Sequence, residues 1–275
     1  MLLSSDFIFE RGSHHQVCED YASSGVKNSN SDSISAFAAI SDGCSGSPNS
    51  DIGSRIVIKC AENKIKHDFP EEELFRKRVF NNMEACCEDL GLNKNALDAT
   101  LLFLHVNNNG YEVRAYGDGS IIKLKHDGTI EFTLIEYPSN APLYFNYYGF
   151  SNYNRLNQYK SSFGVVRNIY KYIINPDSSD CIISIDEDAT PYIERGENEY
   201  KVIAVTSDGI SSFFKQSVEN PYESICEEDI VKLLMDYKTV DREFIQRKMN
   251  GFKKHCKMNN WKHSDDFSMA GVSFE

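Results

Sequence analysis

Residues 37–43 read FAAISDG and residues 202–209 read VIAVTSDG, so an apolar run that ends in Ser-Asp-Gly occurs at two distant places in the chain. Each run is rich in residues that form buried strands. An aspartate at the end of a strand can project its carboxylate into a cleft, and the glycine that follows lets the backbone turn sharply. Asp42 and Asp208 are therefore the first candidates for a functional site.

Other carboxylates occupy similar positions. Asp118, within Tyr-Gly-Asp-Gly, and Asp265, before the last apolar run, also lie at predicted strand ends. Glu19 and Asp20 add carboxylates near the start of the chain. Because Asp-Gly is also a common hairpin turn, the pair at residues 127–128, between two β-forming runs, is predicted to be only a turn.

A cluster of such carboxylates predicts a divalent metal site. Like charges a few ångströms apart repel and raise each other's pKa, and a hard divalent cation removes that penalty. Oxygen ligands without thiolate or imidazole favour Mg²⁺ or Mn²⁺ over zinc. Two such ions support in-line hydrolysis of a phosphoester by a metal-activated water.

Four helices are predicted from apolar spacing. The first follows Gly43, with Ser50 or Asp51 as its N-cap, and the second begins after Pro70 and stops at Gly91. Two more are expected at about residues 227–237 and 241–258. The apolar residues predicted to face inward are Ile52, Ile56, Cys60 and Ile65 on the first helix, and Leu74, Val79, Phe80, Met83 and Cys87 on the second.

Short β-forming runs separate the helices. Four of them, between residues 98 and 136, are divided by Asn-Gly and Asp-Gly turns, which predicts an antiparallel meander. Further strands are expected at residues 34–40, 181–185, 202–206 and 267–274, whereas the polar stretch 23–33 is predicted to be a loop. Helices in two groups with many strands between them indicate the α+β class, with sheets packed under helices.

The chain is expected to form one domain over residues 1–275, because no repeat or long linker interrupts it. Residues at about 137–172 are rich in Tyr and Asn and have poor periodicity, which predicts an irregular insertion. An aromatic surface of this kind suits peptide recognition, but ordinary packing explains it equally well.

Composition excludes several classes of protein. The 275 residues include 41 acidic and 29 basic ones, and the formal net charge of −12 repels nucleic acid and anionic membranes. No apolar stretch approaches about 18 residues, and the first ten lack the pattern of a signal peptide. Eight cysteines form neither a CxxC pair nor a zinc pattern. We therefore expect a cytoplasmic monomer with free thiols.

Taken in order, the motifs resemble those of the metal-dependent protein phosphatase 2C (PPM) family, in a divergent bacterial-type branch. The match runs from Gly12 to Phe274. The family's fold is a central antiparallel β-sandwich flanked by helices, in four αββα layers, and this architecture is expected here. The matching motifs are Glu19-Asp20, Asp42-Gly43 with Gly46, Gly117-Asp118-Gly119, Ser207-Asp208-Gly209 and Asp265-Asp266.

The resemblance implies two or three Mg²⁺ or Mn²⁺ ions and assigns ligands by position. Asp42 resembles the carboxylate that bridges two metals, and Asp42 and Asp208 are the expected catalytic aspartates. The other implied ligands are the Gly43 carbonyl, Asp20 in preference to Glu19, Asp118 for a third ion, and Asp265 beside Asp208 on the first.

Two positions, His15 and Cys44, depart from the familiar eukaryotic pattern. His15 stands where a phosphate-binding arginine is expected, and GSHHQVCED at residues 12–20 instead resembles the bacterial branch. A histidine can donate a hydrogen bond to phosphate, but it lacks the bidentate fork of arginine. Cys44 replaces a histidine proposed as general acid and is expected to be a small buried filler. Asp266, by contrast, stands at the family's Asn/Asp position and is expected to orient a water or a ligand.

The resemblance therefore implies a phosphatase that acts on phosphoserine and phosphothreonine in a phosphorylated protein. The replacement of the arginine by His15 leaves open a catalytically weak or inactive, phosphatase-like binding module. The Tyr-rich insertion lies where the family carries its variable flap beside the active site.

Overall fold

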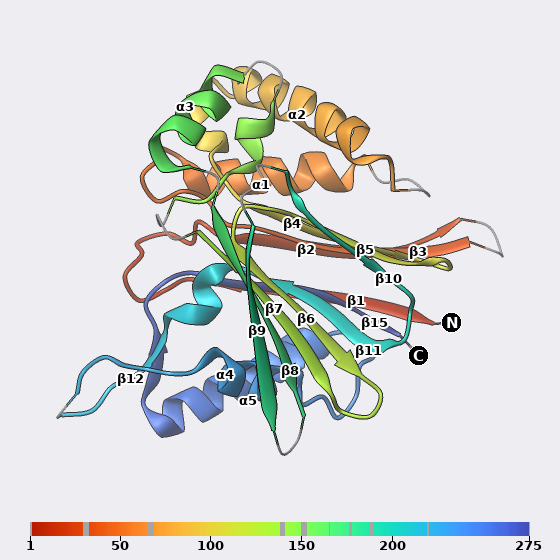
Figure 1. The fold of residues 1–275 in the computed structure, drawn as a ribbon, viewed down its shortest axis with the longest axis vertical. Helices are drawn as coiled ribbons and strands as arrows, with labels where there is room; N and C mark the ends of the chain where they lie inside the picture. Colours follow the sequence, from red (N-terminus) through yellow and green to blue (C-terminus); the bar gives the residue numbers. More distant parts are fainter. Residues whose placement is uncertain are drawn as a thin grey trace.

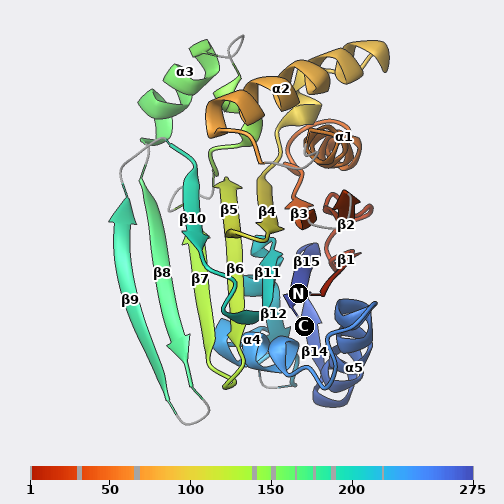
Figure 2. The ribbon, with the colours of Figure 1, turned by 90° about the vertical axis from the view of Figure 1, so that its right-hand side faces the viewer.

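The computed structural model describes residues 2–29, 33–64, 69–137, 141–149, 153–164, 166–175, 178–186, 190–218 and 220–274. Two antiparallel sheets face each other, and helices cover the outer face of each (Figures 1 and 2). The apolar side chains form two clusters, one between the sheets and under the first two helices, and one under the last two. The predicted α+β sandwich with four αββα layers is confirmed.

One sheet has seven strands in the order β1-β15-β11-β6-β7-β8-β9, and every neighbouring pair is antiparallel. Its strands are β1 (Leu3–Glu10), β6 (Gly119–Lys125), β7 (Ile130–Glu136), β8 (Arg167–Ile174), β9 (Ser179–Asp186), β11 (Tyr200–Thr206) and β15 (Phe267–Phe274).

The second sheet has five strands in the order β10-β5-β4-β3-β2, and a small third sheet has the order β13-β12-β14. The strands of the second sheet are β2 (Tyr21–Ser29), β3 (Ser33–Ser41), β4 (Leu101–Asn107), β5 (Gly110–Tyr116) and β10 (Tyr192–Gly196). Those of the small sheet are β12 (Phe213–Lys215), β13 (Glu223–Ser224) and β14 (Trp261–His263).

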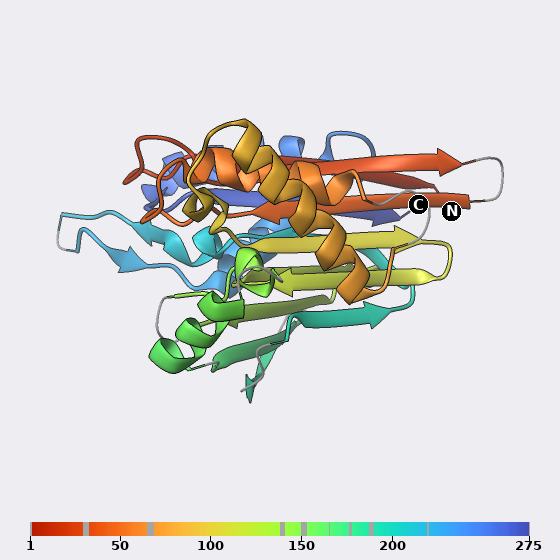
Figure 3. The same cartoon turned by 90° about the horizontal axis from the view of Figure 1, so that it is seen from above.

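Helices α1 (Ser50–Glu62) and α2 (Glu72–Asp89) cover the five-stranded sheet, and α4 (Glu227–Met235) and α5 (Phe244–Asn259) cover the seven-stranded one (Figures 1 and 3). The remaining helical segments are η1 (Lys94–Leu97), η2 (Phe145–Tyr148), α3 (Tyr153–Phe163) and η4 (Asp208–Ser212).

The details of the first two helices differ from the prediction. The N-cap of α1 is Asn49, in the left-handed conformation with φ 58°, rather than Ser50 or Asp51. In α2, Phe75 is fully buried while Leu74 is 42% exposed, so the inward face begins one residue later than expected. Ile65 lies outside the described residues.

The predicted meander is divided between the two sheets. Strands β4 and β5 form a hairpin of one sheet, and β6 and β7 form a hairpin of the other. The chain crosses at Gly117, Asp118 and Gly119, where both glycines have positive φ. A side chain at Gly119 would place its Cβ 2.6 Å from the Thr206 carbonyl oxygen. The pattern detected the hairpins but not their sheets, because turn residues say nothing about what a strand packs against.

Two segments predicted to lack regular structure form part of the sheets or helices. Within 23–33, the described residues belong to β2 and β3, because β2 is an edge strand, where polar residues are tolerated. Within 137–172, the described residues include η2, α3 and most of β8. Isoleucine occurs on both faces of β8, and the two tyrosines share the face opposite Ile169 and Ile173, so apolar and aromatic residues alternate without a clear two-residue period. Residues 30–32, 138–140, 150–152 and 165 lie outside the described part of the chain.

Lys123, in β6, pairs with one glutamate from each sheet, Glu131 in β7 and Glu194 in β10. Its Nζ lies 2.8 Å from Glu131 Oε2 and 2.7 Å from Glu194 Oε1, and its side chain is 9% exposed. Burial by itself lowers the pKa of Lys123, but the two glutamates outweigh this and raise it.

We expect Lys123→Met to lower the free energy of unfolding by about 3 kcal/mol, because it removes the lysine that pairs with the largely buried Glu194 and one of the two lysines that pair with Glu131. Lys125→Met is the matched control, since Lys125 pairs with the same Glu131 but is 34% exposed. The control should cost at most about 1 kcal/mol in urea unfolding. Equal losses in the two variants would contradict this account.

Candidate metal centre

Five aspartates come to the end of the sandwich that is opposite the chain termini (Figure 1). The antiparallel register explains why: Tyr21 pairs with Ser41, so the residues just before β2 and just after β3 lie together. In the same way, Thr206 at the end of β11 pairs with Ser120 and Met269, near the starts of β6 and β15. The carboxylates delivered to this end are Asp20, Asp42, Asp118, Asp208 and Asp265.

These carboxylates are close enough to perturb one another. Burial and the charges of Asp20 and Asp208 hold the pKa of Asp42 well above its usual range. Burial and the charge of Asp208 do the same to the pKa of Asp118. Burial and the charge of Asp265 raise the pKa of Asp208 to about 6. The cluster therefore resists full ionisation unless positive charge enters it.

Asp20 is buried and has one carboxylate oxygen that could bind a metal ion. It is 1% exposed, and burial raises its pKa to about 7. Its Oδ2 accepts a hydrogen bond of 2.7 Å from Ser207 Oγ, while its buried Oδ1 has no hydrogen-bond partner. An orphaned buried carboxylate oxygen among other carboxylates fits a hard divalent cation, which prefers oxygen ligands.

The backbone around Asp42 is held firmly. Its N–H donates to Thr100 Oγ1 at 2.9 Å, and its carbonyl accepts from the Thr100 N–H at 2.8 Å. Ser41 Oγ donates to the Thr100 carbonyl at 2.6 Å. Gly43 is buried, and a Cβ there would lie 2.6 Å from the Ser50 carbonyl oxygen. Only glycine lets the start of α1 approach this closely.

Asp98, just before β4, has a structural role. It accepts hydrogen bonds from Arg155 Nη2 at 2.6 Å and from Asn146 Nδ2 at 2.8 Å. Arg155 belongs to α3 and Asn146 to η2. The carboxylate therefore ties the segment predicted to be the flap to the chain just before β4, next to the centre.

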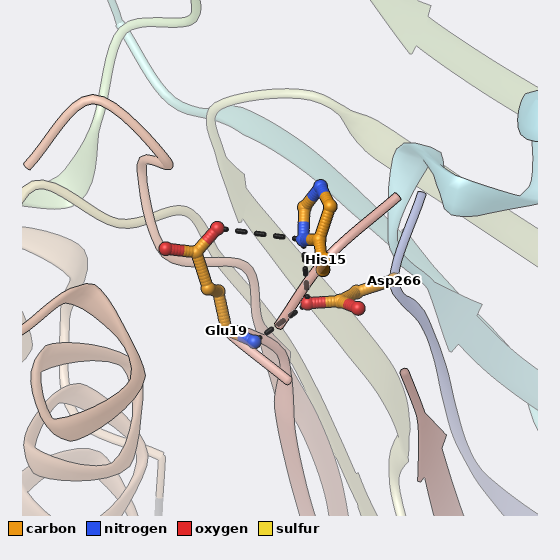
Figure 4. Close-up of side chains that lie close together, drawn as sticks. All are labelled: His15, Glu19 and Asp266. Carbon is orange, nitrogen blue, oxygen red and sulfur yellow. Dashed lines mark hydrogen bonds and ion pairs between the residues drawn. The ribbon is translucent and has the colours of Figure 1, made fainter. Parts of the chain in front are cut away.

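A second, outer cluster consists of His15, Glu19 and Asp266 (Figure 4). His15 Nδ1 lies 3.0 Å from Asp266 Oδ2 and 3.4 Å from Glu19 Oε2, and its Nε2 lies 3.2 Å from Asp265 Oδ1. Partial burial works to lower the pKa of His15, but the charges of Asp266, Asp265 and Glu19 outweigh it and raise the pKa above 6.5. A ring nitrogen of His15 and one carboxylate oxygen each of Glu19 and Asp266 lie within 4.8 Å of one another, which is close enough to share a cation.

Asp266 anchors the loop that carries the outer cluster. It is 2% exposed and accepts hydrogen bonds from the N–H groups of Gly12, at 2.7 Å, and Glu19, at 2.6 Å. Glu19 itself accepts a hydrogen bond from Ser50 Oγ. Of the two adjacent acids, Asp20 thus points into the buried cluster and Glu19 lies at its rim.

Comparison with known proteins identifies the family. The model of the family described as protein phosphatase 2C matches residues 11–240. The chain belongs to the protein phosphatase 2C family. No curated protein matches it significantly in sequence.

Solved structures of bacterial phosphatases have the same fold. A bacterial serine phosphatase with a point substitution is 12% identical with a TM-score of 0.60, and all of both chains is covered. Serine/threonine phosphatase Stp1 from Staphylococcus aureus is 14% identical, with a TM-score of 0.57 over 100% of this chain and 96% of the other. The Mycobacterium tuberculosis serine/threonine phosphatase PstP/Ppp is 15% identical with a TM-score of 0.54, again over the whole of both chains.

In this protein phosphatase 2C family chain, Tyr144 is a neighbour of the centre that sequence reasoning missed. Burial, followed by the adjacent Cys44 thiol and then Asp42, raises the pKa of its phenol. Cys44 is half-buried rather than fully buried. No spacing distinguishes Tyr144 from the other tyrosines around it, so only the tertiary structure could select it.

Among the described residues, no helix has both the length and the apolar character needed to cross a bilayer.

Proposed function

We propose that this chain is a metal-dependent phosphatase that removes phosphate from phosphoserine and phosphothreonine in a protein substrate. The main observation in support is that a group of buried and half-buried aspartates all have raised pKa values. They are Asp20, Asp42, Asp118 and Asp208. Such repulsion is relieved by divalent cations. Family membership and the serine/threonine phosphatases of the same fold support the same reaction.

The proposed ligands of two or three Mg²⁺ or Mn²⁺ ions are Asp20, Asp42, the Gly43 carbonyl, Asp118, Asp208 and Asp265. When bound, such ions supply a water of lowered pKa and neutralise charge on the phosphoryl oxygens. Thr100 holds the backbone of Asp42, and Ser207 holds one oxygen of Asp20. These hydrogen bonds keep the ligands in position before a cation arrives.

His15 is proposed to assist phosphate binding. Asp266 fixes its ring at 3.0 Å, and 22% of the side chain is exposed beside the aspartates. A charge-assisted hydrogen bond contributes about 1.5–3 kcal/mol, so we expect His15→Gln to raise the KM for a phosphopeptide about tenfold or more. His14→Gln is the control, because the neighbouring His14 is exposed. Equal KM values for the two variants would remove His15 from substrate binding.

The proposal is tested by turnover of p-nitrophenyl phosphate and of phosphoserine and phosphothreonine peptides. We expect hydrolysis with Mn²⁺ or Mg²⁺ and none after chelation with EDTA. Full activity in EDTA, or no activity with either metal, would overturn it.

One observation favours a second candidate, an inactive phosphatase-like binding module. His15 replaces the expected arginine and contacts three carboxylates. Calorimetric titration with Mn²⁺ separates the candidates when run beside the turnover assay. A binding module is expected to bind Mn²⁺ weakly, or to bind it without hydrolysing any phosphoester.

A further inference from the structure

A pocket of about 570 Å³ lies between α5, β14 and the residues that follow β1. Aromatic rings form much of its wall. The Phe213 ring lies 5.4 Å from that of Phe252 and 5.8 Å from that of Phe267, and it stacks on His263 at 5.2 Å. Trp261 completes this wall. Such a surface is suited to an apolar side chain, which it would remove from water.

The rim of the pocket is basic, although the chain as a whole carries a net charge of −12. Its basic residues are Arg11, Lys253, Lys257 and Lys262, and its one acidic residue among the described lining is Glu10, which pairs with Lys253. Helix α5, which reads FIQRKMNGFKKHCKMN, contains no acidic residue at all.

The basic groups of the rim are only partly neutralised. Within the described chain, the ion pairs of α5 use Arg247, Lys248 and Lys253 and leave out Lys257. Lys262 is likewise exposed and has no ion pair among the described residues. These charges remain available to an acidic ligand.

Two chain segments connect the pocket directly to the metal centre. Ser13 donates to the His263 carbonyl from its N–H, at 3.1 Å, and from its Oγ, at 2.9 Å. Ser13 and His263 both line the pocket. Two residues further along their segments, His15 and Asp265 face each other at 3.2 Å beside the aspartate cluster. A polypeptide that occupies the pocket therefore lies next to the site of the proposed reaction.

We propose that this pocket binds a bulky apolar side chain within an acidic segment of the phosphoprotein substrate. The inference rests on the phosphatase function proposed above and adds a class of substrate to it. The aromatic wall receives the apolar side chain, and the unpaired lysines attract the flanking carboxylates. A basic segment is disfavoured by the like charges of the rim, which act locally against the negative net charge of the chain.

Binding can be measured without turnover, because Trp261 is the single tryptophan of the chain and lines the pocket. The probe is an unphosphorylated pentapeptide with a central leucine flanked by glutamates, added to the Mn²⁺-treated protein. We expect a saturable change in tryptophan fluorescence, and we expect the affinity derived from it to fall as salt is added. The same peptide with alanine for leucine, or with lysine for glutamate, should bind at least about tenfold more weakly.

Charge reversal on the rim gives the matched test. The double variant Lys257→Glu/Lys262→Glu should weaken binding of the leucine-glutamate peptide at least about tenfold. Lys254→Glu makes the same kind of change at an exposed position of α5 that does not line the pocket. It should leave the titration nearly unchanged. No fluorescence change in the wild type, or an equal loss of peptide affinity in both variants, would overturn the proposal. It would also be overturned if anionic lipid vesicles, and not the peptide, gave a saturable fluorescence change.

Kinetics connect the pocket to the substrate and separate its failure from that of the proposed function. The double variant should raise KM about tenfold for a phosphopeptide that carries the leucine-glutamate segment, with kcat and the hydrolysis of p-nitrophenyl phosphate unchanged. If KM is unchanged and p-nitrophenyl phosphate turnover is normal, the pocket does not bind the substrate, and the proposed phosphatase function is unaffected. Absence of turnover in the wild type with Mn²⁺ rejects the phosphatase function, and the fluorescence titration still decides what the pocket binds.

Discussion

Asp42→Asn is expected to reduce phosphatase turnover by at least about 10³-fold, because it removes the central carboxylate of a cluster that is proposed to hold the catalytic ions. The same substitution should leave the metal-free protein at least as stable as the wild type. Burial and the charges of Asp20 and Asp208 already disfavour the ionised form of Asp42. A neutral amide removes that repulsion.

Asp127→Asn is the matched control, since this aspartate also precedes a glycine but lies in the turn between β6 and β7. Its Oδ1 accepts the Thr129 N–H at 2.9 Å, and Asn-Gly suits such a turn as well as Asp-Gly. We expect unchanged turnover in this variant. The measurements are steady-state kinetics with Mn²⁺ and thermal melting in EDTA. Loss of turnover accompanied by a lower melting temperature in Asp42→Asn would point to a folding defect and contradict the proposed role.

The affinity for Mn²⁺ is expected to rise steeply with pH, by about tenfold per pH unit below pH 6 for each proton that the metal displaces. The reason is that the pKa of Asp208 is raised to about 6 and that of Asp20 to about 7. Protons therefore compete with the metal for these carboxylates. Calorimetric titrations at about pH 5.5, 6.5 and 7.5 measure the affinity and the protons released. An affinity that is constant over this range would contradict the electrostatic account of the cluster.

The stability of the metal-free protein should change in the opposite direction. The pKa values of these aspartates are higher in the folded protein than in the unfolded chain, so the folded state binds more protons between about pH 4 and 7. Their contribution to the free energy of unfolding therefore falls as pH rises through this window. Melting temperatures in EDTA should fall from about pH 5 to pH 7.5, and Mn²⁺ should restore more stability at the higher pH. Asp42→Asn should show a weaker dependence.

Much of this architecture was predictable from local patterns. Apolar runs that end in Ser-Asp-Gly identified β3 and β11, the helical spacing identified α1, α2, α4 and α5, and the last strand was placed at its observed bounds. These features depend on neighbours within about ten residues, which a sequence displays directly. The order of the aspartate motifs was sufficient to indicate the family.

The predictions were wrong for two segments, 23–33 and 137–172, in which strand pairing rather than local propensity determines the secondary structure. Polar β2 is a strand because β3 pairs with it along its whole length. Residues 167–174 form strand β8 because they pair with β7 on one side and with β9 on the other. Backbone pairing with neighbours far along the chain outweighs the weak local preference of such segments.

The sequence by itself determined which carboxylates lie at strand ends, and hence which chemistry the chain can support. Only the tertiary structure decided which of them meet. Antiparallel pairing in two facing sheets brings Asp20, Asp42 and Asp208 to one end, turns Glu19 to the rim, and places Tyr144 beside them. The basic pocket likewise joins residues 10–13 to residues 249–267. Proximity of this kind follows from strand register and sheet packing, which are long-range properties that no local pattern contains.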